Sequence, residues 1–389
     1  MKRIEKIEEL AEALGRAAHV KLYGAGLKLA SFMEMITELK MPLRAECVLV
    51  SSARGNPSMV FGIPVEGVSE AVFHDMDVIL LTMSERFVAD AEENLARRGV
   101  TRNIYSIDYA MVDAIPYQKV FESVKPFVQS RLWLSGDRNL PVKTDENYVW
   151  SCWWQGEENA PELVKKCWES QRKRIPEGTK HVIITWDNYR NYMELPEYVV
   201  EKAKRGSLLP AHLADIVRCI LLYKYGGIWL DATVYMTDRL PEACFSYEIL
   251  TRSTGERIYC TDVSWVTWFL GGRKGQELYR FLMEAFFYYL KEYDKILHYY
   301  MIDFLIAIAC NEIEGIGETF QKIPVNNQNA AELQKYLAEA YDRELYRTCT
   351  EGGFLQKLTY KGGGYAENSL YRYLMGANML DADRKRGGT

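Results

Sequence analysis

Residues 211–233 read AHLADIVRCILLYKYGGIWLDAT, and the pattern of this segment predicts a helix followed by a strand. Its apolar side chains recur three, four, seven and eight positions apart, which is the spacing of one face of an α-helix. They are Leu213, Ile216, Val217, Ile220 and Leu221. Gly226 and Gly227 would end this helix and reverse the chain. The apolar residues 228–230 would then form a short strand that ends at Asp231.

Simple lengths bring two acids and a base together at the end of that strand. Asp215 and Arg218 lie three residues apart on the polar side of the helix, so they are neighbours. The helix measures about 16 Å from Asp215 to the glycines, and the strand measures roughly 13–16 Å from the glycines to Asp231. If the strand runs antiparallel to the helix, Asp231 returns to the level of Asp215 and Arg218. Ligands of open α/β sheets bind at strand ends, so we predict a binding site here.

The same residues carry a resemblance to a known family. The run from Asp215 to Asp231 has the form D-x-x-R-x-x-x-L-Y-x-x-G-G-x-W-x-D and continues with Ala232 and Thr233. This pattern resembles the signature of DXD-type glycosyltransferases of the sugar-binding-region group, and above all their bacterial capsular polysaccharide synthesis branch. The segments 153–156 (WWQG) and 357–359 (KLT) also fit that family. The resemblance covers most of residues 147–389 and implies a GT-A fold that transfers a sugar from a nucleotide donor.

The resemblance also implies roles for individual residues. Trp154 would stack on the base, Asp215 and Arg218 would hold the donor sugar and diphosphate, and Asp231 would hold the ribose or a divalent metal. The wider group has a second aspartate where this chain has Thr233, which offers only a neutral oxygen. One carboxylate and a diphosphate can still hold Mn²⁺ or Mg²⁺. We therefore expect a metal-assisted, retaining transferase that uses a nucleotide sugar, with UDP as the first choice, and a surface glycan as acceptor.

Two further positions need an interpretation. Neighbouring residues on a strand point to opposite faces, so only one of Trp153 and Trp154 can face a nucleotide. We assign Trp154 to the nucleotide, because it occupies the tryptophan position of the family pattern, and Trp153 to the core. Asp303 lies in the apolar stretch 299–310, where a carboxylate needs a partner. It either lines an acceptor cleft or is a structural acid, and the sequence leaves both alternatives open.

The first part of the chain predicts a small parallel sheet. Apolar strands are expected at 20–23, 47–50, 77–82 and 103–107, and helices at 27–39 and 84–98. Strands that alternate with helices form parallel sheets, so we predict a Rossmann-like domain over residues 1–125. Gly24 and Gly26 follow the first strand, but Leu29 stands where a dinucleotide-binding loop has its third glycine. We therefore favour a structural or docking role for this domain over nicotinamide binding.

The second domain begins after a segment without periodicity. Residues 126–145 contain Pro126, Gly136 and Pro141, and we interpret them as a linker. A second α/β domain, predicted to have the GT-A fold, then covers residues 146–389. It opens with an expected strand, helix and strand at 147–154, 161–171 and 181–185.

Composition excludes several classes of protein. The net charge of −5 argues against a nucleic-acid binder. No stretch of about 20 apolar residues encodes a transmembrane segment, and the start of the chain carries no apolar signal region. The eight cysteines are scattered, as is typical of a reducing compartment. We therefore expect a cytoplasmic protein, with peripheral association with a membrane assembly complex as the only membrane contact.

Two other functions stay open from the sequence. Because Thr233 interrupts the D-x-D pattern, the chain could be a non-catalytic scaffold of a polysaccharide-assembly complex. The first domain could instead be a nicotinamide-dependent enzyme that modifies sugars, since residues 62–65 (GIPV) resemble a segment of Rossmann-like domains that accompany such enzymes.

Overall fold

The chain forms two compact units, residues 1–119 and 120–389. The computed structural model describes the whole chain except residues 54–55, 255–259 and 377–389. Each unit has its own sheet and its own hydrophobic core. The two units are therefore described one at a time.

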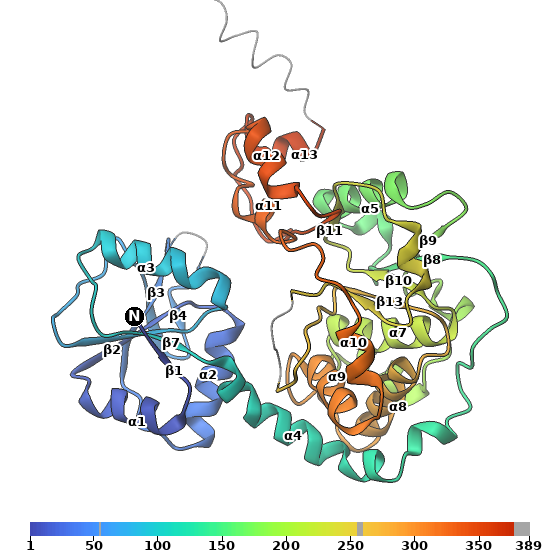
Figure 1. Ribbon diagram of the computed structural model, residues 1–389, viewed down its shortest axis with the longest axis horizontal. Coiled ribbons are helices and arrows are strands. Elements are labelled where there is room, and N and C mark those ends of the chain that lie inside the picture. Colours follow the sequence, from blue (N-terminus) through green and yellow to red (C-terminus); the bar gives the residue numbers. More distant parts are fainter. Residues whose placement is uncertain (54–55, 255–259, 377–389) are drawn as a thin grey trace, which may run out of the picture. The chain divides into compact units, whose positions relative to one another are not determined.

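The first unit is a seven-stranded sheet with the strand order β1-β7-β6-β2-β3-β5-β4. All neighbouring strands are parallel except β4 and β5, which form an antiparallel pair. The strands are β1 (Lys2–Ile4), β2 (His19–Tyr23), β3 (Ala45–Val50), β4 (Met59–Val60), β5 (Ile63–Gly67), β6 (Asp77–Leu81) and β7 (Ile104–Ile107). Helices α1 (Ile7–Arg16) and α2 (Leu27–Glu38) cover one face, and α3 (Val88–Arg97) covers the other (Figure 1). The predicted parallel α/β sheet is confirmed, with β1, α1 and the β4–β5 pair as additions.

The glycine loop after β2 has a steric explanation within this unit. Gly24 has a φ of +117°, and a Cβ atom at this position would lie 2.7 Å from the carbonyl oxygen of Thr82. Leu29, which stands at the third position of the loop pattern, is fully buried in the core. The loop is therefore shaped by close packing between the strands and α2.

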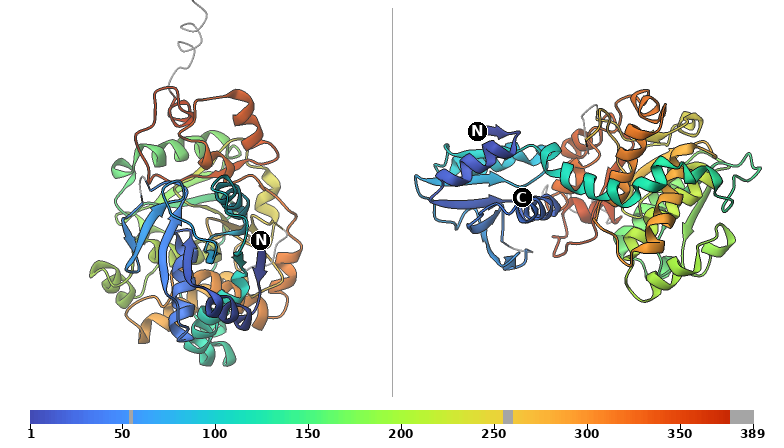
Figure 2. Two further views of the ribbon diagram at one scale, coloured as in Figure 1. Left: turned by 90° about the vertical axis from the view of Figure 1, so that its left-hand side faces the viewer. Right: turned by 90° about the horizontal axis from the view of Figure 1, so that it is seen from below.

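A single long helix runs through the boundary between the units. Helix α4 spans Tyr109–Gln129 and contains Pro116 and Pro126 (Figures 1 and 2). Each proline removes one backbone donor, and the prolines led us to expect irregular chain from residue 126. A 3₁₀-helix at Leu132–Ser135 follows, in which Trp133 is buried and donates a 3.0 Å hydrogen bond to Glu277. Much of the segment expected to be a linker is thus packed structure of the second unit.

The second unit is built on a five-stranded sheet with the order β12-β13-β10-β8-β9. Strands β10, β8 and β9 are parallel, while β13 pairs antiparallel with both β10 and β12. Their bounds are β8 Tyr148–Cys152, β9 Lys180–Ile184, β10 Gly227–Leu230, β12 Leu250–Thr251 and β13 Phe269–Gly272. A separate antiparallel pair joins β11 (Val234–Met236) to β14 (Leu355–Lys357). This mixed sheet confirms the α/β class that was predicted for the second domain as well.

Helices surround both sheets of this unit. They are α5 (Glu162–Arg174), α6 (Glu197–Lys204), α7 (Pro210–Lys224), α8 (Glu277–Glu292), α9 (Met301–Glu312), α10 (Ile316–Gln321), α11 (Glu332–Lys335), α12 (Arg343–Thr350) and α13 (Leu370–Leu374). Helices α7, α8 and α9 pack together (Figure 1), and the short helices α11 to α13 share a hydrophobic cluster that includes Tyr235 of β11. None of the helices in the described part of the chain is both long enough and apolar enough to cross a lipid bilayer.

Candidate functional site

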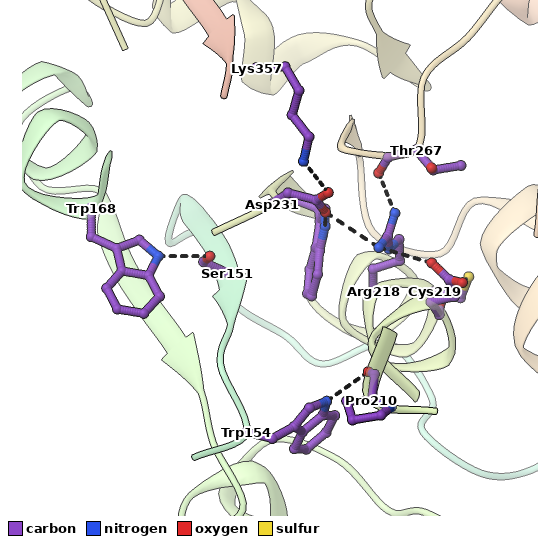
Figure 3. A network of polar contacts seen from close by, with 11 residues as sticks. Ser151, Trp154, Trp168, Pro210, Arg218, Cys219, Asp231, Thr267 and Lys357 are labelled. Atoms are coloured by element: carbon purple, nitrogen blue, oxygen red, sulfur yellow. Dashed lines mark hydrogen bonds and ion pairs between the residues drawn. The ribbon is translucent and has the colours of Figure 1, made fainter. Parts of the chain in front are cut away.

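Helix α7 and strand β10 bring together the three residues expected to form the site. Asp215 and Arg218 lie in the middle of α7 and are buried, with Arg218 Nη2 2.9 Å from Asp215 Oδ1. The chain reverses at the two glycines after α7, and Asp231 directly follows β10. Arg218 Nη2 lies 3.4 Å from Asp231 Oδ1 (Figure 3). The convergence expected from the lengths of helix and strand is therefore present.

Both carboxylate oxygens of Asp231 are held by donors. Besides Arg218, its Oδ1 accepts a 2.9 Å hydrogen bond from the indole of Trp229, and its Oδ2 lies 2.7 Å from the Nζ of Lys357 (Figure 3). The Arg218 guanidinium is fixed in turn, because Nη1 donates to the carbonyl oxygen of Thr267 at 2.5 Å. Its centre also lies 4.9 Å from the ring centroid of Trp229. The result is a network of alternating charges at the end of β10.

Lys357 was not predicted as a site residue. It ends β14, which pairs antiparallel with β11 so that Lys357 lies opposite Val234. The next residue extends this register, since the backbone N–H of Leu358 donates to the carbonyl oxygen of Thr233 at 3.0 Å. The pairing holds the lysine beside the turn that follows Asp231. The only signal in the sequence was the family resemblance of residues 357–359, which assigned no role to the lysine.

The two acids differ in electrostatic environment. Burial tends to raise the pKa of Asp231, but Lys357, Arg218 and the indole N–H of Trp229 outweigh it and hold the pKa well below its usual range. Burial raises the pKa of Asp215 to about 7, against the attraction of Arg218 and with the help of the negative charge of Asp231. The donors around Asp231 thus favour its anionic form, whereas burial opposes the charge of Asp215.

The burial of the two adjacent tryptophans is the reverse of the expectation. Trp154 is 5% exposed, and its indole donates to the carbonyl oxygen of Pro210 at 3.0 Å (Figure 3). Trp153 is partly exposed, and its ring lies edge-on to that of Tyr360 at 5.6 Å. Strand β8 ends at Cys152. The expectation had followed the tryptophan position of the family pattern, and the burial of these two side chains does not agree with it.

With this geometry established, we compared the chain with known proteins. A model of the family described as "Capsular polysaccharide synthesis protein" matches residues 118–374, well over half of the chain. The chain belongs to this family. The matched region begins at the start of the second unit and contains every site residue named above.

Individual relatives match shorter parts of the chain. The O-glycosyltransferase braB of Annulohypoxylon truncatum is 31% identical over 114 residues, which is 27% of each chain. The O-glycosyltransferase PaGT of Phomopsis amygdali is 29% identical over 155 residues, 36% of this chain and 37% of that one. The matches thus span at most 37% of these relatives' own length. The solved PaToxG glycosyltransferase covers 63% of this chain at 11% identity with a TM-score of 0.32, too low to define a common fold.

The structure also describes the other two residues that the sequence singled out. Thr233 lies in the turn after Asp231, which is closed by a 2.9 Å bond from the backbone N–H of Val234 to the carbonyl oxygen of Asp231. Asp303 is buried in α9 and accepts a 3.0 Å hydrogen bond from the indole of Trp265. This partner favours the structural interpretation of Asp303 over a place in an acceptor cleft.

The charged groups nearest to Asp231 are cations of the protein itself. Both oxygens of Asp231 face donors, one of them the ammonium group of Lys357. Thr233 adds no charge. Within the described residues, no cluster of three or more histidine, cysteine or acidic side chains could hold a metal ion. The carboxylate is matched to cations that belong to the protein itself.

Proposed function

We propose that this member of the capsular polysaccharide synthesis family is a glycosyltransferase. In the cytoplasm it would move a sugar from a nucleoside diphosphate sugar to a growing glycan that is destined for the cell surface. A UDP-sugar is the first candidate for the donor. The observation that carries the proposal is the network of Asp215, Arg218, Asp231 and Lys357 at the end of β10. Parallel strands end at this edge of the sheet, where α/β folds bind their ligands. The glycosyltransferase names of the relatives point to the same activity.

Two of the charged residues would bind the diphosphate, and the other two would hold those cations in position. Lys357 would bind the phosphate oxygens directly, and the buried Arg218 would add its Nε, which has no hydrogen-bond partner among the described residues. Asp231 lies between the two cations and orients both, and Asp215 holds Arg218 from within α7. Thr233 would add a neutral donor at the turn.

The aromatic rings beside this network suit a nucleotide base. We expected Trp154 to stack on the base, but a ring that is 5% exposed offers no free face. Trp153 is partly exposed and Tyr360 is 43% exposed, and the two rings meet edge-on. Tyr360 also lies only three residues after Lys357. We therefore propose Trp153 as the base-stacking residue, with the buried Trp168 edge-on to it at a centroid distance of 6.4 Å.

We propose that the transfer retains the anomeric configuration, as the family resemblance implies. The bond between the anomeric carbon and the β-phosphate oxygen breaks, and its electron pair stays on that oxygen. The acceptor oxygen bonds to the anomeric carbon on the same face, and its proton passes to the leaving phosphate. Negative charge grows on the diphosphate during this step, and Arg218 and Lys357 would stabilise it from fixed positions.

One observation favours a second candidate function, the non-catalytic scaffold. Asp215, Arg218, Asp231 and Lys357 pair with one another as they could in a purely structural network, although the buried Nε of Arg218 has no hydrogen-bond partner among the described residues. Hydrolysis of a panel of UDP-, GDP- and dTDP-sugars by the full chain separates the two functions. A transferase hydrolyses at least one donor slowly, and Arg218→Ala removes that activity. A folded wild-type protein that neither binds nor hydrolyses any of them is a scaffold.

A further inference from the structure

The position of Lys357 is set by the backbone and not only by its own side chain. Strand β14 is paired with β11. Lys357, the last residue of β14, lies opposite Val234, which follows Asp231 by three positions. The ammonium group reaches Asp231 Oδ2 at 2.7 Å, while the lysine side chain remains 29% exposed. An ammonium group has three N–H donors. One is directed to Asp231 and the others can reach a ligand from the solvent side.

The charges of this site leave little room for a further cation. Asp231 is bound by Lys357 through one oxygen and by Arg218 through the other. A divalent ion on the same carboxylate would stand within a few ångströms of both cations and be repelled by them. A diphosphate has the opposite requirement, because its negative charges need cations in fixed positions. The site as built is matched to an anion and not to a metal ion.

We propose that Lys357 provides the positive charge that a divalent metal provides in DXD-type glycosyltransferases, so that this protein binds its donor diphosphate without a metal. The inference rests on the proposed function, since it assigns the chemistry of the same site. It explains the pairing of Lys357 with Asp231 and the neutral residue at position 233 together. Where a second aspartate would add a metal ligand, this chain has Thr233 and a lysine from a distant strand.

The first test measures diphosphate binding by calorimetry with the full-length protein, once in EDTA and once with Mg²⁺ or Mn²⁺. The probes are UDP and inorganic pyrophosphate, which separates the contribution of the base from that of the phosphates. We expect the wild type to bind UDP equally well in both buffers. Lys357→Met keeps most of the aliphatic stem and should weaken binding in EDTA by about tenfold or more. Lys357→Arg should retain binding, and the exposed Lys361→Met in the same segment is the matched control.

The second test measures whether a metal ion binds at this site once the lysine is replaced. Lys357→Glu would place two carboxylates side by side, which is a better ligand set for a hard cation. Free Mn²⁺ can be followed by its electron paramagnetic resonance signal without any nucleotide or turnover. We expect Lys357→Glu to bind Mn²⁺ and the wild type to leave it free. Equal binding of Mn²⁺ by both proteins would overturn the proposal.

The remaining outcomes are distinguishable. If the wild type binds UDP only with metal present, or if Lys357→Met binds as well as wild type in EDTA, the lysine does not take the metal's place and the glycosyltransferase proposal stands. If the wild type binds neither UDP nor pyrophosphate nor the GDP and dTDP alternatives in any buffer, the proposed function fails and this inference fails with it. Should Lys357→Met not fold, the wild type and Lys357→Arg in EDTA decide the question.

Discussion

The indole of Trp150 donates a 2.9 Å hydrogen bond to the backbone carbonyl of Gly226, and so ties strand β8 to the turn that precedes β10. Gly226 and Gly227 both have positive φ angles, +71° and +94°. A Cβ atom on Gly227 would overlap the carbonyl oxygen of Tyr148 in the neighbouring strand. This turn therefore depends on glycine for conformation and for space, and it sets the register that brings Asp231 to Arg218.

Replacing Gly227 by alanine should lower the free energy of unfolding. The loss should exceed the conformational cost of placing an alanine at a positive φ angle. The conformational part is about 1–2 kcal/mol, and the clash with Tyr148 adds to it because β8 is a central strand. Gly178→Ala is the matched control, since Gly178 has a φ of +79° and open space around it. Urea denaturation of both variants measures the difference. Equal losses would show that the backbone at Gly227 relaxes without cost.

The two tryptophans should give different phenotypes. Trp154→Ala removes a buried ring that packs on Trp186 at a centroid distance of 4.7 Å, and it should lower stability by about 3–5 kcal/mol. Trp153→Ala should cost less stability but weaken UDP binding by about 1–3 kcal/mol, the range for aromatic stacking on bases. Chemical denaturation and calorimetry measure the two effects. The opposite pattern would return base stacking to Trp154.

Local patterns predicted the centre of the site, and long-range pairing completed it. Helix α7, the glycine turn and β10 are contiguous in sequence, so periodicity and simple lengths placed Asp215, Arg218 and Asp231 together. Lys357 reaches them through β14, a strand of three residues whose partner lies more than 100 positions earlier. Such a short strand has no periodicity that could reveal its partner.

Two errors in the sequence interpretation also have local causes. The assignment of Trp154 to the nucleotide followed the family pattern, but Trp154 is the buried member of the pair. The expected linker contained Pro126, which α4 tolerates in its last turn. The first prediction relied on a family pattern, and the second on the general rule that proline interrupts a helix.

Asp231→Asn should reduce donor binding and turnover by at least about tenfold. The amide can no longer neutralise Lys357 and Arg218, so both cations lose their orientation. The buried Arg218 then lacks part of its compensation, and we expect a loss of stability of about 1–3 kcal/mol as well. Asp145→Asn, at an exposed position, is the control. Donor hydrolysis at wild-type rates in Asp231→Asn would remove Asp231 from the site.

His181 should make the second unit sensitive to mild acid. Burial, with a contribution from Arg172, lowers the pKa of His181 to about 4 from its usual value of about 6.5. Between these two values the unfolded chain binds a proton that the folded chain excludes, so stability is full above pH 6.5 and falls as the pH drops towards 4. The loss is at most about 3 kcal/mol. His181→Gln should flatten the pH dependence of urea denaturation between pH 7 and 4, and an unchanged slope would contradict the assignment.

The second unit should fold and bind donor alone if it is cut before Trp133. A fragment of residues 120–389 keeps Phe127 and Trp133, which pack on Phe281 at centroid distances of 5.7 and 5.3 Å. A fragment of residues 140–389 loses both rings and the hydrogen bond from Trp133 to Glu277. We expect the first to denature cooperatively and bind UDP, and the second to be markedly less stable. A shorter fragment as stable as the longer one would show that residues 120–139 are dispensable.

The pairing of β14 with β11 means that the site is completed only late in the synthesis of the chain. A growing chain acquires Asp215, Arg218 and Asp231 early in the second unit, but Lys357 follows Asp231 by 126 residues. Until that segment has emerged and paired, Asp231 lacks one of its two cations. Domains fold as units while they are made, yet this one can complete its binding site only after β14 is in place. A nascent chain would therefore be folded in part well before it could bind a diphosphate.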